Sequence, residues 1–553
     1  MKKLYRRRGV AVGGVAGLAC GLLAGCAEPQ AQASGLVTPL FSADAANVRV
    51  AAGAHYAQRG AWWQRLWGPH YRQLWATPVT VPVLRLGTAG LQPLHAGGSF
   101  QTNTLRLRNA DGHTYVLRSV DKDLSRSVAT GWLEEFVGPV LRDQTSAAPP
   151  YGANVAAALA QAAGVYHTNP HLVYLQPDSA LGSFRSRFQP ALYLLEERPD
   201  NEQRATPLFG GAQFVTGSGP MLHAILREPN VHVAARAYLR ARLLDMLVGD
   251  WSRRADQWRW AMFTKAGHTE YRPIPRDRDQ AFFRFDDGWL TRAISWVRPR
   301  YQSFDAPLPP MGVAALTVTA RPLDQTILGL LPEADFQAEA DSLCRRLPEA
   351  VLAAALRTVP REAQAQMAEA LLPDLRRRRL AMPAAAARYY QVLHDDATIV
   401  GTDAAERFVL TAAGPGSLRL QVWALRATRP DSLLGEQRYT VRHTRRLSIY
   451  GLGGNDQFEL RGALAPGFAV WLDGGGGVNQ FTQPTPTQKV SVGLTVFAGA
   501  HDQLRLSPTV QVRPASVFTD AVAWISRQYR LGLGNRPTPG KDWHGAPPVD
   551  TAL

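Results

Sequence analysis

Apolar and polar residues alternate with two different periods along this chain, so the sequence predicts both strands and helices. A period of two on both sides of the turn Ala110-Asp111-Gly112 indicates a β-hairpin over 104–120. Helical spacing over 153–164 and 234–248 indicates two helices, the second with its leucines on one face. An apolar run over 193–198 is typical of a further strand.

The character of the chain changes after about Pro310. The segment 333–393 is rich in Ala, Leu and Arg, so we expect a helical connector over 311–396. From Thr398 onward, short alternating runs and glycine-rich turns predict a β-sandwich or a stacked β-roll over 397–484. The expected strands are 407–411, 417–423, 439–444, 447–450, 457–460 and 468–472. The fold class predicted from these patterns is α+β with an all-β domain towards the C-terminus.

The segment 56–75 is rich in aromatic residues at near-helical spacing. We expect these side chains to pack in the core, because aromatic residues bury large apolar areas in folded proteins. The residues are Trp62, Trp63, Trp67, Tyr71 and Trp75.

The first 26 residues carry the features of a processing signal. Five cationic residues up to Arg8 precede a short apolar run over 9–23. The run ends in Leu23-Ala24-Gly25-Cys26, which closely resembles the bacterial lipobox. The resemblance implies a lipoprotein signal peptide with Cys26 as the lipidation site, and therefore a membrane partner reached through the N-terminal lipid.

Composition agrees with a chain that is tethered to a membrane. The small, polar segment 27–55 predicts a flexible tether. Ala27 after the cysteine favours, by resemblance, the outer membrane of the cell envelope. Cys344 is left alone, so no intramolecular disulfide is expected. No stretch after the signal reaches the roughly 18 apolar residues of a membrane-spanning helix.

The formal charge of +16 comes mostly from scattered arginines. The one dense run is Arg376–Arg379. A solvated helix end, or attraction to anionic lipid headgroups, accounts for such a run, and no nucleic-acid partner is expected.

Two loops carry the residues with the clearest chemistry. The first, GDWSRRADQWRW over 249–260, follows the helix predicted over 234–248, and the second, YRPIPRDRDQAF over 271–282, places two aspartates after a proline. Phosphoryl-transfer enzymes need an Asp that orients the acceptor hydroxyl and further oxygen ligands that hold Mg²⁺ against the phosphates. The two loops, in this order, predict such a site.

The loops resemble those of atypical kinases of the CotH spore-coat type and, more distantly, of the HipA type. The second loop fits the P-W-D-x-D-Q-x-F-like pattern of these kinases at Pro275, Asp277, Asp279, Gln280 and Phe282. The resemblance implies a two-lobed kinase-like domain over 56–310 with ATP and magnesium as cofactors. It makes Asp277 a catalytic residue and a metal ligand, and Asp279 a second metal ligand.

The first loop departs from the D-R-(H/N)-x-x-N-like pattern of the same kinases. Ser252 stands where the pattern has its catalytic Asp, and Arg254 stands where it has His or Asn. Gln257 fits the amide position and is a further expected metal ligand. Asp250 is the nearest spare carboxylate, so we expect it to substitute as the catalytic base.

The predicted hairpin supplies the candidate phosphate ligands. Arg118 sits like the lysine of the kinase strand motif V-A-I-K, and Lys122 follows four residues later. An exposed strand cation is the alternative interpretation of Arg118. By resemblance, 193–198 is the hinge between the lobes, which makes Glu196 a cofactor-binding residue.

A glycine-rich turn near the C-terminus raises the question of calcium. Residues 453–458, GGNDQF, partly resemble the RTX nonapeptide of calcium-binding β-rolls. The second copy, over 474–481, has Asn479 where an Asp is needed. Since calcium in such rolls needs stacked repeats, we expect tight turns and no bound calcium.

The order of all these motifs resembles a family of bacterial envelope proteins over about residues 56–480. Those proteins often continue into an outer-membrane β-barrel. A closed barrel needs at least eight strands, and 485–553 holds about three or four candidates. We expect a β-rich tail here, or the start of a truncated barrel.

The sequence therefore predicts an outer-membrane or surface lipoprotein with a kinase-like domain that binds Mg-nucleotide and is impaired in catalysis. Two alternatives stay open. One is a non-enzymatic lipoprotein for binding or assembly in the envelope, with an envelope protein as its partner. The other is an active atypical kinase of envelope substrates.

Overall fold

The computed structural model describes most of the chain. The signal peptide with Cys26, the tether as far as residue 45 and the tail from residue 530 lie outside the described residues. The described residues are 46–97, 102–124, 132–204, 208–308, 311–462, 467–483 and 493–529.

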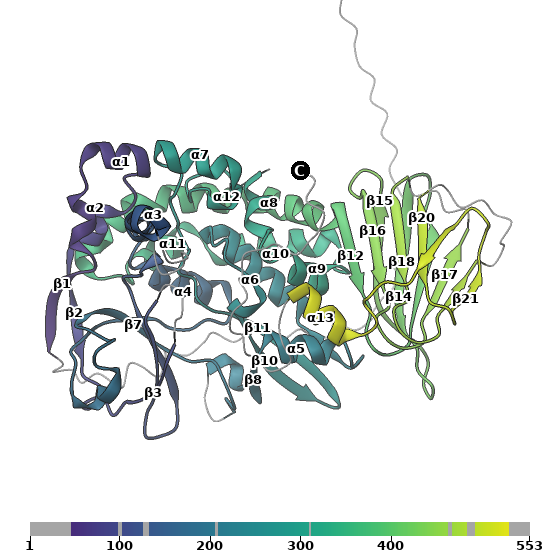
Figure 1. The fold of residues 1–553 in the computed structure, drawn as a ribbon, viewed down its shortest axis with the longest axis horizontal. Coiled ribbons are helices and arrows are strands. Elements are labelled where there is room, and N and C mark those ends of the chain that lie inside the picture. The colour runs from purple at the N-terminus through teal and green to yellow at the C-terminus, as the bar shows by residue number, and fades with distance from the viewer. Residues whose placement is uncertain are drawn as a thin grey trace, which may run out of the picture.

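The fold is α+β, as predicted, with two parts placed along the long axis of the molecule (Figure 1). One part combines two mixed sheets with most of the helices. The other is built from the strands between residues 396 and 514.

A sheet of seven strands forms one end of the first part. In sheet order the strands are β1 (Asn47–Ala51), β2 (Pro78–Leu84), β6 (His171–Leu175), β7 (Ala191–Glu197), β5 (Thr114–Ser119), β4 (Thr104–Arg108) and β3 (Gln92–Gly97). The predicted hairpin is confirmed, because β4 and β5 pair antiparallel with Thr104 opposite Arg118. Strand β1 falls within the segment predicted to be a flexible tether. There, Val48 and Val50 pack against the core and the strand pairs with β2. These contacts order the segment although its composition is small and polar.

A second sheet, of four strands, carries the two candidate loops. Its strands in order are β8 (Phe214–Gly217), β10 (Trp258–Lys265), β11 (His268–Pro275) and β9 (Val231–Val233). Trp258 lies opposite Pro275, so the loop before β10 and the loop after β11 leave the same end of this hairpin. The predicted helix before the first loop is confirmed as α6 (Ala235–Val248). It ends at Gly249, whose φ of 73° is a left-handed conformation that costs glycine little.

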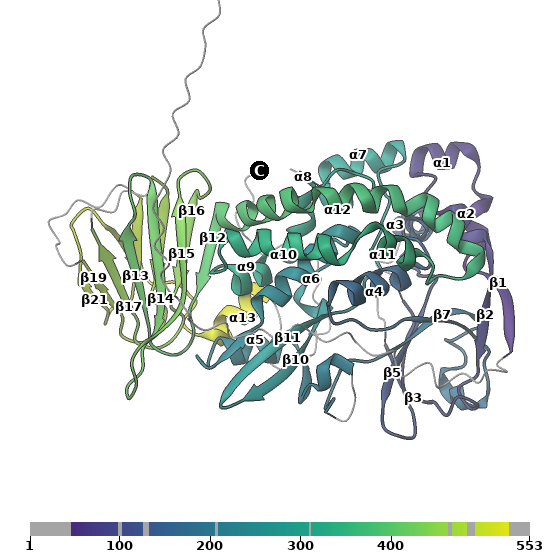
Figure 2. The same cartoon turned by 180° about the vertical axis from the view of Figure 1, so that it is seen from behind.

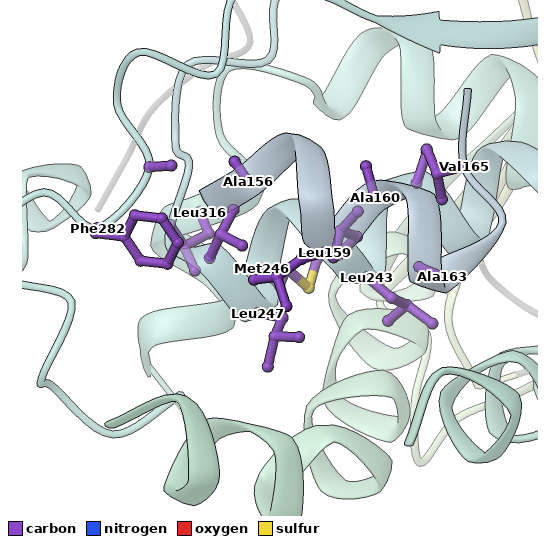
Figure 3. Packing of buried hydrophobic residues seen from close by; sticks show 14 of the residues in the cluster. Ala156, Leu159, Ala160, Ala163, Val165, Leu243, Met246, Leu247, Phe282 and Leu316 are labelled. Atoms are coloured by element: carbon purple, nitrogen blue, oxygen red, sulfur yellow. The ribbon is translucent and has the colours of Figure 1, made fainter. Parts of the chain in front are cut away.

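The predicted helical segment is present and packs on the same core as the two sheets. Helices α10 and α12 contact α6, and α11 contacts the predicted Ala-rich helix α4. Figure 3 shows α4 and α6 in contact, with Phe282 of the second loop in the same cluster. These helices are α4 (Gly152–Ala163), α6 (Ala235–Val248), α8 (Met311–Thr317), α9 (Arg321–Leu328), α10 (Glu333–Arg346), α11 (Glu349–Leu356) and α12 (Gln364–Asp395).

The remaining helices lie around these elements. They are α1 (Ala61–Trp67), α2 (Arg72–Ala76), α3 (Trp132–Asp143), α5 (Ser218–Ile225), α7 (Trp289–Val297) and α13 (Ala521–Tyr529). Of the aromatic residues predicted to pack in the core, Tyr71 and Trp75 are buried, but Trp62 is exposed on α1. Within the described ranges, no helix combines the length and apolar character needed to cross a bilayer.

The C-terminal part is a parallel β-roll of two sheets, the second of the two architectures left open by the sequence. One sheet holds β12 (Asp396–Val400), β16 (Arg446–Tyr450), β18 (Ala469–Asp473), β20 (Leu494–Ala498) and β22 (Gln511–Pro514). The other holds β15 (Ser432–Thr440), β14 (Ser417–Ala424), β13 (Glu406–Ala412), β17 (Gln457–Arg461), β19 (Gln480–Thr482) and β21 (Gln503–Arg505). From β16 onward, successive strands alternate between the sheets and strands two apart pair in parallel. Before that, β12 and β13 pair in parallel with β16 and β17, and β13, β14 and β15 pair antiparallel within one sheet.

A ladder of buried side chains sets the repeat of the β-roll. The side chain of Asp456 accepts a hydrogen bond from the Glu406 N–H at 2.8 Å, and that of Asn479 accepts one from the Asp456 N–H at 3.0 Å. Asp502 accepts from the Asn479 N–H at 2.8 Å, again 23 residues further along the chain. In the turns that resemble RTX repeats, the side chains of Asp456 and Asn479 therefore accept hydrogen bonds from backbone N–H groups of the preceding turn of the roll.

The tail predicted to be β-rich over 485–553 is only partly so. Strands β20, β21 and β22 continue the parallel stack across residue 484 without a break in its pairing. The chain then forms helix α13, which returns to the first part of the molecule, as Figure 2 shows from behind. The hydroxyl of Tyr529 donates to the Pro322 carbonyl at 2.9 Å, so α13 is fixed on α9.

We expect Asp456→Asn to stabilise the protein at pH 8 by on the order of 2 kcal/mol and to flatten its pH dependence. Burial, with Glu406 nearby, raises the pKa of Asp456 to about 9, and burial raises that of Glu406 to about 7. Folded protein therefore holds protons that the unfolded chain releases above about pH 4. Stability is complete below about pH 4 and falls as the pH rises from there to about 9, where folded Asp456 also loses its proton. The next turn of the roll already has Asn479 at the equivalent position.

Thermal unfolding of both proteins between pH 5 and 9 measures this effect. The control is Asp111→Asn, in an exposed turn of the other part. If wild type and Asp456→Asn lose stability equally as the pH rises, the raised pKa of Asp456 is not the cause of the pH dependence.

Candidate active site

Charged side chains from both mixed sheets meet at the end of the β10–β11 hairpin. Arg118 forms an ion pair with Asp277 and lies 2.7 Å from Glu196 Oε1. Lys122 Nζ lies 2.5 Å from Asp279 Oδ2, and Arg118 lies 3.8 Å from Asp279 Oδ1. The structure thus brings together five residues singled out from the sequence.

The register of the seven-stranded sheet places two of these residues. Arg118 on β5 lies opposite Leu194 on β7, and Val116 lies opposite Glu196. Because side chains two apart on a strand share a face, Arg118 and Glu196 emerge on the same face of the sheet. That face looks towards the loop after β11.

The loop after β11 is held in a constrained backbone conformation. Asp277 and Phe282 have φ angles of 58° and 62°, a left-handed region that non-glycine residues adopt infrequently. The N–H of Phe282 donates to the Val248 carbonyl at 2.7 Å, at the end of α6, and its ring is fully buried. Backbone strain of this kind is held in place by its surroundings and is often found at functional sites.

The two aspartates of this loop have different electrostatic environments. Burial raises the pKa of Asp277 to about 6, although Arg118 acts in the opposite direction. Burial would also raise the pKa of Asp279, but Arg118 and Lys122 outweigh it and hold that pKa well below its usual range. Burial alone would lower the pKa of Arg118, yet Asp277, Asp279 and Glu196 together raise it.

A pocket opens beside these ion pairs. Its polar lining comes from Arg118, Lys122, Gln144, Thr145, Asp279 and Gln280. Its apolar lining includes Trp75, Leu194 and Phe283. Apolar walls with a few converging charged groups are typical of sites for small ligands.

Several arginines gather near the end of β7, beyond Glu196. Burial and the neighbouring Arg276, Arg198 and Arg106 together lower the pKa of Arg259 to about 9. Asp200, which pairs with Arg198, acts in the opposite direction on Arg259. A guanidinium crowded by others is stabilised by a multiply charged anion such as a phosphate chain.

Asp250, expected to be the substitute base, lies in a different environment. It is fully buried and forms an ion pair with Arg253, and its other oxygen accepts from the Ser252 N–H at 3.0 Å. Burial raises its pKa against the effect of Arg253. Since both oxygens are engaged and no surface is exposed, an external hydroxyl does not reach this carboxylate in the present conformation.

The other residues of the first loop lie nearer the surface. Ser252 is partly buried, and Arg254 pairs with Asp256 at 3.1 Å on the exposed side of the loop. Gln257 meets the second loop through its backbone, because its carbonyl accepts from the N–H of Arg276 at 2.9 Å. This hydrogen bond places Gln257 beside the residue that precedes Asp277.

Sequence reasoning missed the buried charges behind the two loops. Asp245 on α6 lies 3.2 Å from Arg242, 3.3 Å from Arg253 and 3.1 Å from Arg278, and all of these side chains are buried. Arg242 also pairs with Asp324 on α9 at 3.0 Å. The spacing of Arg242 and Asp245 on a predicted helix was the available signal, but only the fold brings both loops to it.

Magnesium would have to be held by few protein ligands here. Within the described ranges, no three His, Cys, Asp or Glu side chains are grouped as a metal site. Asp277 and Asp279 are the carboxylates that the second loop supplies, which fits an ion that is commonly held by one or two carboxylates together with phosphates.

No family model and no curated protein sequence matches this chain. Among solved structures it is similar to the Helicobacter pylori proinflammatory kinase CtkA, at 11% identity and a TM-score of 0.27, over 55% of this chain and 95% of that one. It is also similar to HipA of a Shewanella oneidensis MR-1 toxin–antitoxin system, at 11% identity and a TM-score of 0.25, over 54% and 66% of the two chains. A third is the Rio2 kinase of Chaetomium thermophilum, at 15% identity and a TM-score of 0.20, over 48% and 72%.

We expect Asp245→Asn to destabilise the protein by about 3–5 kcal/mol, because it leaves buried guanidinium groups without their shared carboxylate. Arg278 is affected most, since Asp245 is its ion-pair partner. Denaturant unfolding measures the change. Asp256→Asn, on the exposed side of the first loop, is the matched control and should shift stability by less than about 0.5 kcal/mol. Similar small effects of both substitutions would show that the buried set does not hold the loops.

Proposed function

We propose that residues 56–310 form an atypical kinase-like domain that binds Mg-nucleotide and turns it over poorly. The observation that carries this proposal is the meeting of Arg118 and Lys122 from one sheet with Asp277 and Asp279 from the other. Phosphoryl-transfer sites need cations for the phosphates and carboxylates for the metal at one place. The carboxylates come from a loop whose sequence resembles that of atypical kinases, and Arg118 sits like the lysine of the kinase strand motif.

The charges of the site suit a nucleotide that arrives with its metal. Mg²⁺ would exchange for Arg118 and Lys122 at the carboxylates, and these two cations would then contact phosphate oxygens. ATP would supply the transferable phosphoryl group. The arginines around Arg259 add positive charge on the hinge side, which favours phosphates over a neutral ligand.

Poor turnover follows from the first loop. Ser252 stands at the position of the base, and a serine hydroxyl does not accept a proton at neutral pH. Asp250, the nearest carboxylate, is buried against Arg253. General-base assistance typically contributes about 10²–10⁴-fold to a rate, so its absence lowers turnover while leaving the binding groups in place.

A non-enzymatic role in the envelope is the second candidate. The observation in its favour is that both metal-binding carboxylates already have cationic partners within the protein. In that case the ion pairs join the two sheets, and the domain acts as a scaffold that binds an envelope protein.

We further propose that the protein is a lipoprotein of the outer membrane or cell surface. The support is the Leu23-Ala24-Gly25-Cys26 sequence, which lies outside the described residues. Two acyl chains or more give stable anchoring, whereas one chain alone binds a membrane only marginally.

We expect Mg-ATP, but not ATP with a chelator, to raise the melting temperature of the wild-type protein by several degrees. A ligand present at about 100 times its Kd adds about 2.7 kcal/mol to stability. Asp279→Asn should abolish the shift, because it removes a metal ligand, whereas Asp111→Asn in the exposed turn should preserve it. If neither Mg-ATP nor Mg-ADP shifts the melting temperature, nucleotide binding is excluded and the scaffold role remains.

We expect Ser252→Asp to raise the rate of phosphoryl transfer, measured with radiolabelled ATP, by about 10²-fold or more while leaving nucleotide affinity unchanged. Arg254→Asp, two positions away on the exposed side of the loop, is the control for added negative charge. A wild-type rate equal to that of Ser252→Asp would instead favour an active atypical kinase of envelope substrates.

We expect Cys26→Ala to leave the protein unprocessed or to release it from membranes, because acylation needs the cysteine thiol. Membrane fractionation and intact mass of the two proteins measure this. Unchanged mass and membrane partition would exclude lipidation at this residue.

A further inference from the structure

Helix α7 presents its apolar side to solvent and its polar side to the protein. Its buried residues are Thr291 and Ser295. Its exposed residues include Trp289, Trp296 and Val297, whose exposed fractions are 64%, 79% and 78%. A surface helix of a soluble domain normally shows the opposite arrangement.

The inverted orientation of α7 is fixed by hydrogen bonds. Ser295 Oγ donates to the Tyr301 carbonyl at 2.8 Å, and the Gly288 N–H donates to Thr291 Oγ1 at 3.1 Å. Gly288 itself lies so close to helix α1 that a Cβ atom there would come within 2.4 Å of the Gly68 nitrogen. Rotating α7 to hide its tryptophans would break these contacts.

Helix α1 extends the same apolar surface. It has no buried residue, and Trp62 is 68% exposed. The two helices contact each other, and Figures 1 and 2 show them side by side along one edge of the molecule. We call this surface the α1–α7 patch, and it consists of Trp62, Trp289, Leu290, Ile294, Trp296 and Val297.

The charge around the patch is positive. The sequences of α1 and α7 contain arginine but no acidic residue. The guanidinium of Arg65 lies 5.5 Å from the Trp62 ring, and Arg292 and Arg298 are exposed on or next to α7. The acidic groups closest to α7 in sequence are Asp286 and Asp287, and Asp287 is engaged by the backbone N–H and the ring of His70. Asp143 accepts a hydrogen bond from Trp63 of α1, but it is buried and paired with Arg59 and Arg72.

We propose that the α1–α7 patch docks on the surface of a lipid bilayer with anionic headgroups. Tryptophan is enriched where an apolar interior meets water at membrane interfaces, and arginine next to it matches anionic headgroups. Apolar helix faces with Trp and Leu, rimmed by cations, insert into this region without crossing the membrane.

The position of the patch in the chain fits this partner. Ala46, where the described structure begins, is 20 positions after Cys26. Fully extended, a segment of this length spans at most about 70 Å. A lipid on Cys26 and the α1–α7 patch are therefore able to contact one membrane, and the patch would hold the domain in a fixed orientation on it. The docking itself depends on the exposed side chains and not on lipidation or nucleotide binding.

Hydroxyl-radical footprinting of the full chain tests the proposal residue by residue. The arms are protein alone, protein with phosphatidylcholine vesicles, and protein with vesicles containing phosphatidylglycerol. We expect oxidation of Trp62, Trp289 and Trp296 to fall at least about five-fold with the anionic vesicles. Oxidation of Leu433 and Val441, which are exposed on the β-roll, should not change.

A double variant provides the second measurement. Trp289→Ser with Trp296→Ser should abolish the vesicle-dependent protection of Trp62, while Leu433→Ser with Val441→Ser should preserve it. If the vesicles pellet the protein without protecting the three tryptophans, only the N-terminus binds lipid and the proposal is wrong. If protection grows with protein concentration and needs no vesicles, the patch is an interface between two copies of this chain, which also overturns it.

Discussion

The candidate active site depends on one set of buried charges around Asp245. This carboxylate sits on α6 and is shared by arginines from α6, from the first loop and from the second loop. A buried arginine without a counter-charge is very costly, so each loop is confined to the conformation in which its arginine reaches Asp245. The left-handed backbone at Asp277 and the burial of Asp250 are consistent with loops fixed in this way from behind.

In front of this set, the two sheets meet through opposite charges. Arg118 lies on a strand of one sheet and Lys122 follows that strand, whereas Asp277 and Asp279 follow a strand of the other sheet. In the protein alone the opposite charges are paired, because Asp277 and Asp279 each have a cation beside them. The same cations and carboxylates are those that a metal–phosphate ligand requires, so a ligand would replace ion pairs and not fill an apolar void. The arginines around Arg259 add further positive charge beside this region.

In its described residues, the β-roll is held together by hydrogen bonds and stacked rings and not by buried ion pairs. Its repeat is set by side chains that accept backbone hydrogen bonds from the preceding turn, at intervals of 23 residues in its later part. Aromatic rings stack along the same direction, with Phe458 4.8 Å from Phe408 and 4.6 Å from Phe481 between ring centroids. A Cβ on Gly451 would lie 2.1 Å from Asp456 Oδ2, so the ladder also requires a glycine at that turn. Helix α13 then joins the end of the roll to α9 in the first part of the molecule.

The sequence by itself determined the elements whose signals are local. The period of two around the turn at 110–112 and the leucine face of α6 predicted the β4–β5 hairpin and the helix, since both patterns span adjacent residues. The pairing of Arg118 with Asp277, the burial of Asp250 and the outward face of α7 were decided only by the tertiary structure. Each depends on groups far apart in the chain, such as Arg118 and Asp277 or Gly288 and Gly68. A local pattern identifies which residues carry charge or apolar area, but whether a side chain faces a partner, the core or solvent is settled by long-range packing.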